Sequence, residues 1–190
     1  MEKTKIAVFA SGEGTNCENI IRYFQGNDHI EVALVVSNNP EARVLVRAAN
    51  LGVPTRIISR RELNNEPQSV LDALQDCSYI VLAGFLLLVP EYLVKRYHNR
   101  IVNIHPSLLP KFGGKGMWGH HVHEAVKASG DTETGITIHY VNEEMDKGEF
   151  IAQYSTPVSP DDTAEDIARN VRELELKYFP VEIEKTILDS

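Results

Sequence analysis

The sequence predicts an α/β protein with a mainly parallel sheet covered by helices on both faces. Through the first hundred or so residues, short apolar runs alternate with amphipathic helical patterns, which is typical of parallel strands joined by helices. Further along, two runs of alternating apolar and polar residues enclose a short polar loop, which predicts an added antiparallel strand pair. The length of 190 residues suits one domain, so we expect a single domain over residues 1–190.

The expected parallel strands are short, apolar and bounded by turn residues, as buried strands are. They are residues 5–10, 32–36, 54–58, 79–83 and 100–104. Helices are expected between them, from residue 16 onward and over residues 41–50, 62–75 and 90–97. The alternating strands are residues 136–141 and 150–158, and Asp162-Thr-Ala-Glu165 resembles a capping box that opens a long final helix.

Composition excludes several classes of protein. A formal net charge of −8 opposes a nucleic-acid surface built on bulk positive charge, so no nucleic-acid partner is expected. The two cysteines, Cys17 and Cys77, have neither metal-site nor disulfide-framework spacing, which indicates reduced thiols. No apolar run is long enough for a membrane span, and the N-terminal run is too short for a signal-peptide core. We therefore expect a cytoplasmic protein with no membrane partner.

A glycine loop, Ser11-Gly-Glu-Gly-Thr-Asn16, lies between the first expected strand and the first helix. Glycines let the backbone approach a ligand closely, and the amides at a helix N-terminus attract phosphate. A dinucleotide fingerprint would have a third glycine where this chain has Cys17, and a carboxylate after the second strand where it has Ser-Asn-Asn. The loop favours a monophosphate over NAD, the alternative being a tight turn that needs glycine only for its geometry.

The segment Ile101-Val-Asn-Ile-His-Pro-Ser-Leu-Leu-Pro110 ends an apolar strand with two polar side chains. Asn103 and His105 are two positions apart, so they project from the same side of the strand. An amide donor beside an imidazole suits a reaction in which an oxyanion forms while a proton moves. The alternative is that both residues only cap the strand end.

Two further polar segments follow this strand. His120, His121, His123 and Glu124 begin a helix, but their order is not that of H-E-x-x-H and no cysteine is near, so helix-start hydrogen bonding and surface placement are favoured over a metal site. Glycine-rich residues 111–119 before them suggest a flexible or backbone-close loop bordering a pocket.

Asp146, in the polar loop between the last two strands, is the acid of greatest interest. A carboxylate near His105 would favour the imidazolium and orient its ring. Spacing alone does not bring the two together, and a solvated turn residue is the alternative.

Together these segments resemble the phosphoribosylglycinamide formyltransferase family, over nearly the whole chain. The motifs that carry the resemblance are Ser11-Gly-Glu-Gly-Thr-Asn16, Leu82-Ala-Gly-Phe85, Asn103-Ile-His-Pro-Ser-Leu-Leu-Pro-Lys111, Gly135-Ile-Thr-Ile-His139 and Asp146-Lys-Gly148. The resemblance implies a Rossmann-like formyltransferase fold. It also implies that the chain transfers the formyl group of 10-formyltetrahydrofolate to the amine of glycinamide ribonucleotide, in purine biosynthesis and one-carbon metabolism.

The family's site residues fall on matching positions of this chain. The resemblance implies Asn103, His105 and Asp146 as catalytic residues, Gly14, Thr15 and Asn16 as the loop holding the substrate phosphate, and Arg172 and Glu175 as further substrate contacts. It implies a cosubstrate pocket formed by Leu86, Leu88, Val89, Asn103, Asn142, Glu143, Glu144, Met145 and Asp146.

The implied reaction is direct attack of the substrate amine on the formyl carbon through a tetrahedral intermediate. Asn103 and protonated His105 would stabilise the oxyanion, and Asp146 would help move the proton to the leaving folate nitrogen. No metal is implied. The expected partners are the two small molecules, and the chain would act as a monomer or homodimer.

Some residues depart from the family pattern. Phe85 is followed by Leu86-Leu87-Leu88, where an Arg is often present, and the loop over residues 112–119 is longer and richer in glycine than usual. The group that grips the folate glutamate tail is therefore unassigned.

Formyltetrahydrofolate hydrolase and a non-catalytic folate- or nucleotide-binding module are the alternatives. The first normally carries an extra regulatory domain, and the second would not need the catalytic trio. Methionyl-tRNA formyltransferase would need an RNA-binding domain and positive charge.

Overall fold

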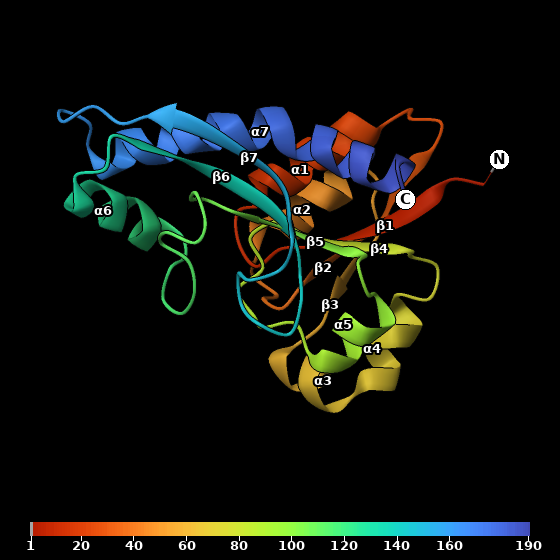
Figure 1. The fold of residues 1–190 in the computed structure, drawn as a ribbon. Helices are drawn as coiled ribbons and strands as arrows, with labels where there is room; N and C mark the ends of the chain where they lie inside the picture. Colours follow the sequence, from red (N-terminus) through yellow and green to blue (C-terminus); the bar gives the residue numbers. More distant parts are fainter. Residues whose placement is uncertain (1) are drawn as a thin grey trace. The chain divides into compact units, whose positions relative to one another are not determined.

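The computed structural model describes residues 2–190 and consists of two compact units, which divide between Val102 and Asn103 (Figure 1). We describe each unit by itself.

The first unit is built on parallel strands, as predicted. Its strands β1 (Thr4–Phe9), β2 (Ile30–Ser37), β3 (Thr55–Ile57) and β4 (Tyr79–Leu82) lie in the order β3-β2-β1-β4. All three pairings are parallel. Strand β5 (Ile101–His105) begins beside β4, where the Ile80 amide donates to the Arg100 carbonyl oxygen at 2.9 Å. Residues 6–10 are fully buried, because β1 has a strand on each side and apolar side chains on both faces.

The helices of the first unit are α1 (Thr15–Phe24), α2 (Arg43–Asn50), α3 (Arg60–Asn65), α4 (Pro67–Ala73) and α5 (Glu91–Arg96). Helix α1 buries one face, formed by Cys17, Ile20, Ile21 and Phe24. The predicted single helix over residues 62–75 was wrong, because the chain breaks it at Glu66 and begins α4 at Pro67. Proline lacks the amide that a continuous helix needs, and its ring clashes with the preceding turn.

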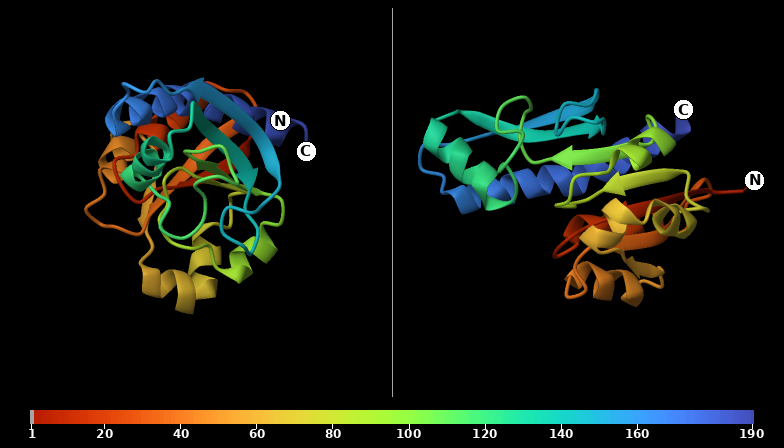
Figure 2. Two further views of the ribbon diagram at one scale, coloured as in Figure 1. Left: turned by 60° about the vertical axis from the view of Figure 1, so that its left-hand side comes forward. Right: turned by 90° about the horizontal axis from the view of Figure 1, so that it is seen from below.

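The second unit holds the predicted antiparallel pair. It contains the end of β5, helix α6 (His120–Ser129), strands β6 (Glu133–Tyr140) and β7 (Phe150–Pro157), and helix α7 (Ala164–Leu188). Strands β6 and β7 pair antiparallel. Helix α7 runs along this pair and α6 packs against α7, as Figures 1 and 2 show. The fold class of a mainly parallel sheet with an added antiparallel pair is therefore confirmed, whereas the single domain over residues 1–190 stays a prediction.

The capping box of α7 lies one residue later than predicted. The Thr163 hydroxyl oxygen accepts from the Asp166 amide at 3.1 Å, and the Asp166 carboxylate accepts from the Thr163 amide at 2.9 Å. Asp162 instead accepts from the Ser159 amide and closes the preceding turn. A carboxylate at the third helical position therefore completes the reciprocal pair that was expected of Glu165.

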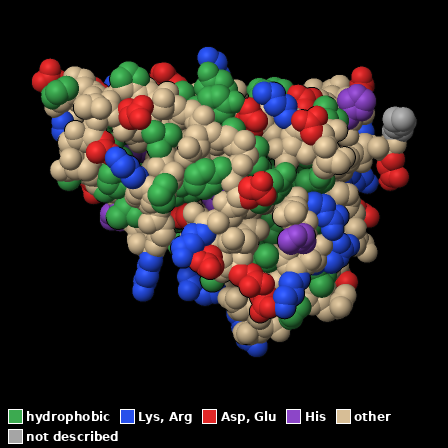
Figure 3. Space-filling model, viewed as in Figure 1, with side chains coloured by type: hydrophobic (Ala, Val, Ile, Leu, Met, Phe, Trp, Pro, Cys, Tyr) green, Lys and Arg blue, Asp and Glu red, His purple; other side chains and the backbone are tan. Residues whose placement is uncertain are grey.

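The surface carries charges of both signs, and both cysteines are free thiols, as the sequence predicts. Acidic and basic side chains are interspersed over the face in Figure 3. Cys17 and Cys77 are buried free thiols, and burial raises the pKa of Cys17 to about 12, so both are packing groups rather than nucleophiles. Among the described residues, no helix has both the length and the apolar character to span a membrane.

Candidate active site

Strand β5 positions the two polar side chains that the sequence singled out. Because side chains alternate along the strand, Asn103 and His105 project from the same side of it. Asn103 Nδ2 lies 3.1 Å from His139 Nε2, and His105 Nε2 lies 2.8 Å from the Phe112 carbonyl oxygen. His105 is buried, so its ring is held in place rather than free in solvent.

Asp146 lies beside His105, although the two residues are distant in sequence. Its Oδ2 accepts from the Gly114 amide at 2.8 Å and lies 3.7 Å from His105 Nδ1. Its Oδ1 lies 3.9 Å from His139 Nε2. The side chain is only 12% exposed. The structure therefore brings the predicted acid to the predicted histidine, with 3.7 Å between the nearest oxygen and nitrogen.

The two nitrogens of the His105 ring have different partners. A carbonyl oxygen can only accept, so the contact with Phe112 requires a proton on Nε2. Nδ1 then faces Asp146 across a gap longer than a hydrogen bond. When the ring is protonated, Nδ1–H is the donor that remains available to a bound molecule.

The glycine-rich loop lies close to this site through its backbone. The Gly114 amide anchors Asp146, and Gly113 lies so near that a Cβ there would be 2.5 Å from the Leu109 side chain and 3.6 Å from the Asp146 Cβ. The expectation of a backbone-close segment beside the site is confirmed for these two residues.

Strand β6 contributes two side chains to which the sequence analysis gave no role. Thr137 Oγ1 accepts from the Leu109 amide at 3.0 Å and donates to the Ser107 carbonyl oxygen at 2.8 Å, fixing the turn after His105. His139, two residues further on, is buried, and its Nδ1 lies 2.8 Å from the Tyr140 carbonyl oxygen. Burial lowers the pKa of His139. The sequence shows that Thr137 and His139 are two positions apart and therefore on the same side of the strand. It does not show which residues contact that side.

The histidines at the start of α6 differ in burial. His120 and His121 are exposed, as predicted, but His123 is buried, which corrects the expected surface placement. Val122, His123 and Val126 form the buried side of α6. Burial, followed by the positive charges of His120, Arg172 and His105, lowers the pKa of His123 to about 4. Among the described residues, no three histidine, cysteine or acidic side chains are grouped as a metal site would need.

Arg172 and Glu175, the predicted substrate contacts, lie on α7. Arg172 is exposed, and its charge and that of His105 both act on buried His123, so Arg172 belongs to the same region of the second unit as the catalytic candidates. Glu175 is half-buried and lies about one turn further along α7.

The glycine loop belongs to the first unit and ends as the N-cap of α1. Gly14 has φ +76°, and a Cβ there would lie 2.5 Å from the Val44 side chain, so only glycine fits. Thr15 and Asn16 then form the first turn of the helix. Arg47 Nε donates to the Glu13 carbonyl oxygen at 2.7 Å and fixes the loop from α2.

The segment expected to line the cosubstrate pocket is tied to this loop. Ser11 Oγ accepts from the Leu86 amide at 2.9 Å and donates to Asn38 Oδ1 at 2.6 Å. Leu86 and Leu88 are 58% and 59% exposed, whereas Val89 is buried. In the second unit, Met145 and its neighbours Asn142, Glu143 and Glu144 are also exposed. Exposed apolar side chains of this kind are available to contact an apolar part of a ligand.

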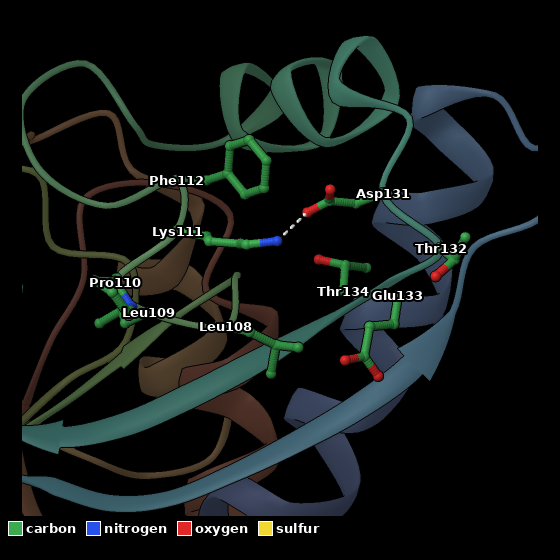
Figure 4. Close-up of a pocket in the computed structure, with 9 residues that line it drawn as sticks. All are labelled: Leu108, Leu109, Pro110, Lys111, Phe112, Asp131, Thr132, Glu133 and Thr134. Carbon is green, nitrogen blue, oxygen red and sulfur yellow. Dashed lines mark hydrogen bonds and ion pairs between the residues drawn. The ribbon is translucent and has the colours of Figure 1, made fainter.

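A separate pocket of about 390 Å³ lies in the second unit (Figure 4). One wall is formed by residues 108–112 and the other by residues 131–134, with an ion pair between Lys111 and Asp131 at 3.0 Å. Its lining residues include none of the predicted site residues, although the wall ends at Phe112, the partner of His105.

Comparison with known proteins identifies the family. The formyl transferase family model matches residues 4–183. The chain belongs to this family. It is 37% identical to phosphoribosylglycinamide formyltransferase of Haemophilus influenzae, over 94% of this chain and 85% of the relative. The chloroplastic enzyme of the same name from Arabidopsis thaliana is 39% identical over 93% of this chain, which spans only 63% of that relative's length.

Solved structures give the same result for the fold. The crystal structure of phosphoribosylglycinamide formyltransferase from Brucella melitensis is 33% identical, with a TM-score of 0.87 over 97% of this chain and 95% of the other. The Rossmann-like formyltransferase fold implied by the sequence motifs is therefore confirmed.

The burial of His123 predicts a pH-dependent stability. The pKa is about 4 in the folded chain against an ordinary value of 6.5, so the unfolded chain binds the extra proton first. The free energy of unfolding should fall as pH decreases from about 6.5 to about 4, with His123 contributing on the order of 2–3 kcal/mol. Urea unfolding of the wild type and of His123→Gln across this range measures the contribution, and exposed His98→Gln is the control. An equal fall in wild type and His123→Gln would contradict the assignment.

Proposed function

We propose that the chain transfers the formyl group of 10-formyltetrahydrofolate to the amine of glycinamide ribonucleotide, a step of de novo purine biosynthesis. The observation that carries the proposal is the convergence of an amide, a histidine and a carboxylate. Asp146 Oδ2 lies 3.7 Å from His105 Nδ1, and Asn103 Nδ2 is hydrogen-bonded to His139 Nε2. Membership of the formyl transferase family and the names of the relatives support it.

In the proposed reaction the neutral amine attacks the formyl carbon. A C–N bond forms, and the formyl oxygen becomes an oxyanion. Asn103 has two N–H groups, of which one is engaged with His139 and the other is available to this oxygen. Protonated His105 offers its Nδ1–H as the second donor, since its Nε2–H is held by Phe112. Hydrogen-bond donors that are fixed in advance stabilise such an intermediate without reorganising.

The proton leaves the attacking amine and reaches the leaving nitrogen of the folate. Asp146 Oδ2 lies 3.7 Å from His105 Nδ1, and its carboxylate is fixed by the Gly114 amide. We propose that Asp146 accepts the amine proton and that His105 supplies the proton that the leaving nitrogen gains as its bond to the formyl carbon breaks. Transfer of one proton from Asp146 to His105 then returns both side chains to their starting charges.

The substrate contacts follow the assignments that the family motifs imply. The amides of Gly14, Thr15 and Asn16 would hold the phosphate, as helix N-termini do. Arg172 and Glu175 would contact the ribonucleotide, with the carboxylate of Glu175 meeting the substrate amine.

The cosubstrate contacts are also proposals. The pterin would lie against Leu86, Leu88 and Val89, with residues 142–146 beside it. The exposure of the two leucines and the hydrogen bond that ties Leu86 to Ser11 support this assignment. The cytoplasmic location and a monomeric or homodimeric state stay predictions.

The direct test supplies both small molecules and measures both products. With purified chain, 10-formyltetrahydrofolate and glycinamide ribonucleotide, we expect one formylated ribonucleotide for each folate that loses its formyl group. Loss of the formyl group without formylated ribonucleotide would instead assign hydrolysis. Absence of both products would favour a binding module.

A second prediction concerns the phosphate loop. In Gly14→Ala the added methyl group meets Val44 and the backbone has a positive φ, so the loop must shift. We expect the KM for glycinamide ribonucleotide to rise about tenfold or more, as expected when one good hydrogen bond is lost, with an unchanged KM for the formyl donor. Gly12→Ala adds the same group where nothing lies within 4 Å. If both variants behave alike, the loop does not hold the phosphate through the Gly14 geometry.

A further inference from the structure

His139 is a buried ionisable side chain of the site, and the proposed mechanism does not use it. It is only 2% exposed, and both of its ring nitrogens are engaged. Nδ1 lies 2.8 Å from the Tyr140 carbonyl oxygen, and Nε2 lies 3.1 Å from Asn103 Nδ2. The ring therefore forms a bridge between a backbone carbonyl and the amide that is proposed to meet the formyl oxygen.

The chemistry of these contacts fixes the tautomer of the ring. The Tyr140 carbonyl can only accept, so Nδ1 carries a proton. Burial lowers the pKa of His139, against the opposing effects of the Tyr140 carbonyl and Asp146, so the ring is neutral. A neutral ring with a proton on Nδ1 has a lone pair on Nε2. Nε2 can then only accept, and Asn103 must donate to it.

The tautomer in turn fixes the orientation of Asn103. An asparagine amide can rotate by half a turn and exchange its oxygen and nitrogen. The flipped amide would place the Asn103 Oδ1 lone pairs against the lone pair of Nε2, which is repulsive and leaves a buried group without its hydrogen bond. The observed orientation keeps NH₂ on the His139 side and leaves its second N–H for a ligand.

We propose that His139 is a positioning residue that holds the Asn103 amide as a hydrogen-bond donor toward the formyl oxygen. The inference rests on the proposed function for the identity of that oxygen. The orientation of the amide itself follows from the two contacts of the ring.

Two further features of the site support this role. Asp146 is almost equally far from the two rings, at 3.7 Å from His105 Nδ1 and 3.9 Å from His139 Nε2. Because His139 is neutral, the carboxylate charge acts chiefly on His105. Gly148 packs so closely against the Tyr140 carbonyl that a Cβ would overlap it, so this segment fixes the acceptor for Nδ1 as well as carrying Asp146.

A double-mutant cycle with a conservative variant tests the role. His139→Leu cannot accept from Asn103, whereas His139→Gln can place its side-chain oxygen near the position of Nε2. We expect His139→Leu to lower kcat by about tenfold or more, with KM values within about twofold, and His139→Gln to recover most of the loss. In an Asn103→Ala background, His139→Leu should lower kcat no further. A loss from His139→Leu that persists undiminished in that background would overturn the proposal.

An activity-independent measurement separates this proposal from the proposed function. Nitrogen-15 NMR of the His139 ring in the wild-type protein should show a protonated Nδ1 and an unprotonated, hydrogen-bonded Nε2 from pH 6 to 8. In Asn103→Ala the Nε2 signal should move toward that of an unbonded nitrogen. A protonated Nε2 would overturn the inference even if formyl transfer is observed, whereas the expected pattern would support it even if the acceptor molecule proves to be different.

Discussion

The arrangement of the site depends on one carboxylate that is largely shielded from solvent. Asp146 carries a charge where little solvent reaches it, so it needs fixed donors, and the Gly114 amide supplies one at 2.8 Å. Two imidazole rings flank the carboxylate at similar distances. The two rings differ in which nitrogen carries a proton, because each ring has a different carbonyl partner. The Phe112 carbonyl takes the Nε2 proton of His105 and leaves Nδ1 facing the acid, whereas the Tyr140 carbonyl takes the Nδ1 proton of His139 and leaves Nε2 for Asn103.

Backbone groups therefore set the protonation pattern, and glycines allow the backbone to come close enough to do so. Gly113 and Gly148 both lie where a side chain would collide, the first with Leu109 and the second with the Tyr140 carbonyl. Thr137 adds a fixed hydroxyl bridge between β6 and the turn that follows His105. The reactive side chains are thus held by strands and close backbone contacts rather than by long flexible groups, which favours a fixed geometry for charge stabilisation.

The sequence predicted what depends on local periodicity. Parallel strands, the antiparallel pair and the common side of Asn103 and His105 all follow from alternation along single segments. The motifs of the family added Asp146, which no spacing could place beside His105. The single helix expected over residues 62–75 does not form because Pro67 begins a new helix. The final capping box lies one residue later than expected because Asp166, rather than Glu165, occupies the third helical position.

The missed features depend on long-range packing. His123 was expected at the surface because the order of the histidines does not suit a metal site, but the helix turns it inward with Val122 and Val126. His139 received no role because its importance lies in the pairing of its two ring nitrogens, one with a neighbouring carbonyl and one with a strand 36 residues away. Only the folded chain shows such pairings.

Asp146 is proposed to take part in proton transfer with His105. The turnover of Asp146→Asn tests it most directly, because the amide keeps the size of the side chain and removes its charge and basicity. The matched control is Glu149→Gln, an exposed acid of the same loop. We expect Asp146→Asn to lose at least about 100-fold in kcat, the scale of acid and base groups, while the control retains its rate. A rate for Asp146→Asn near that of the wild type would contradict it.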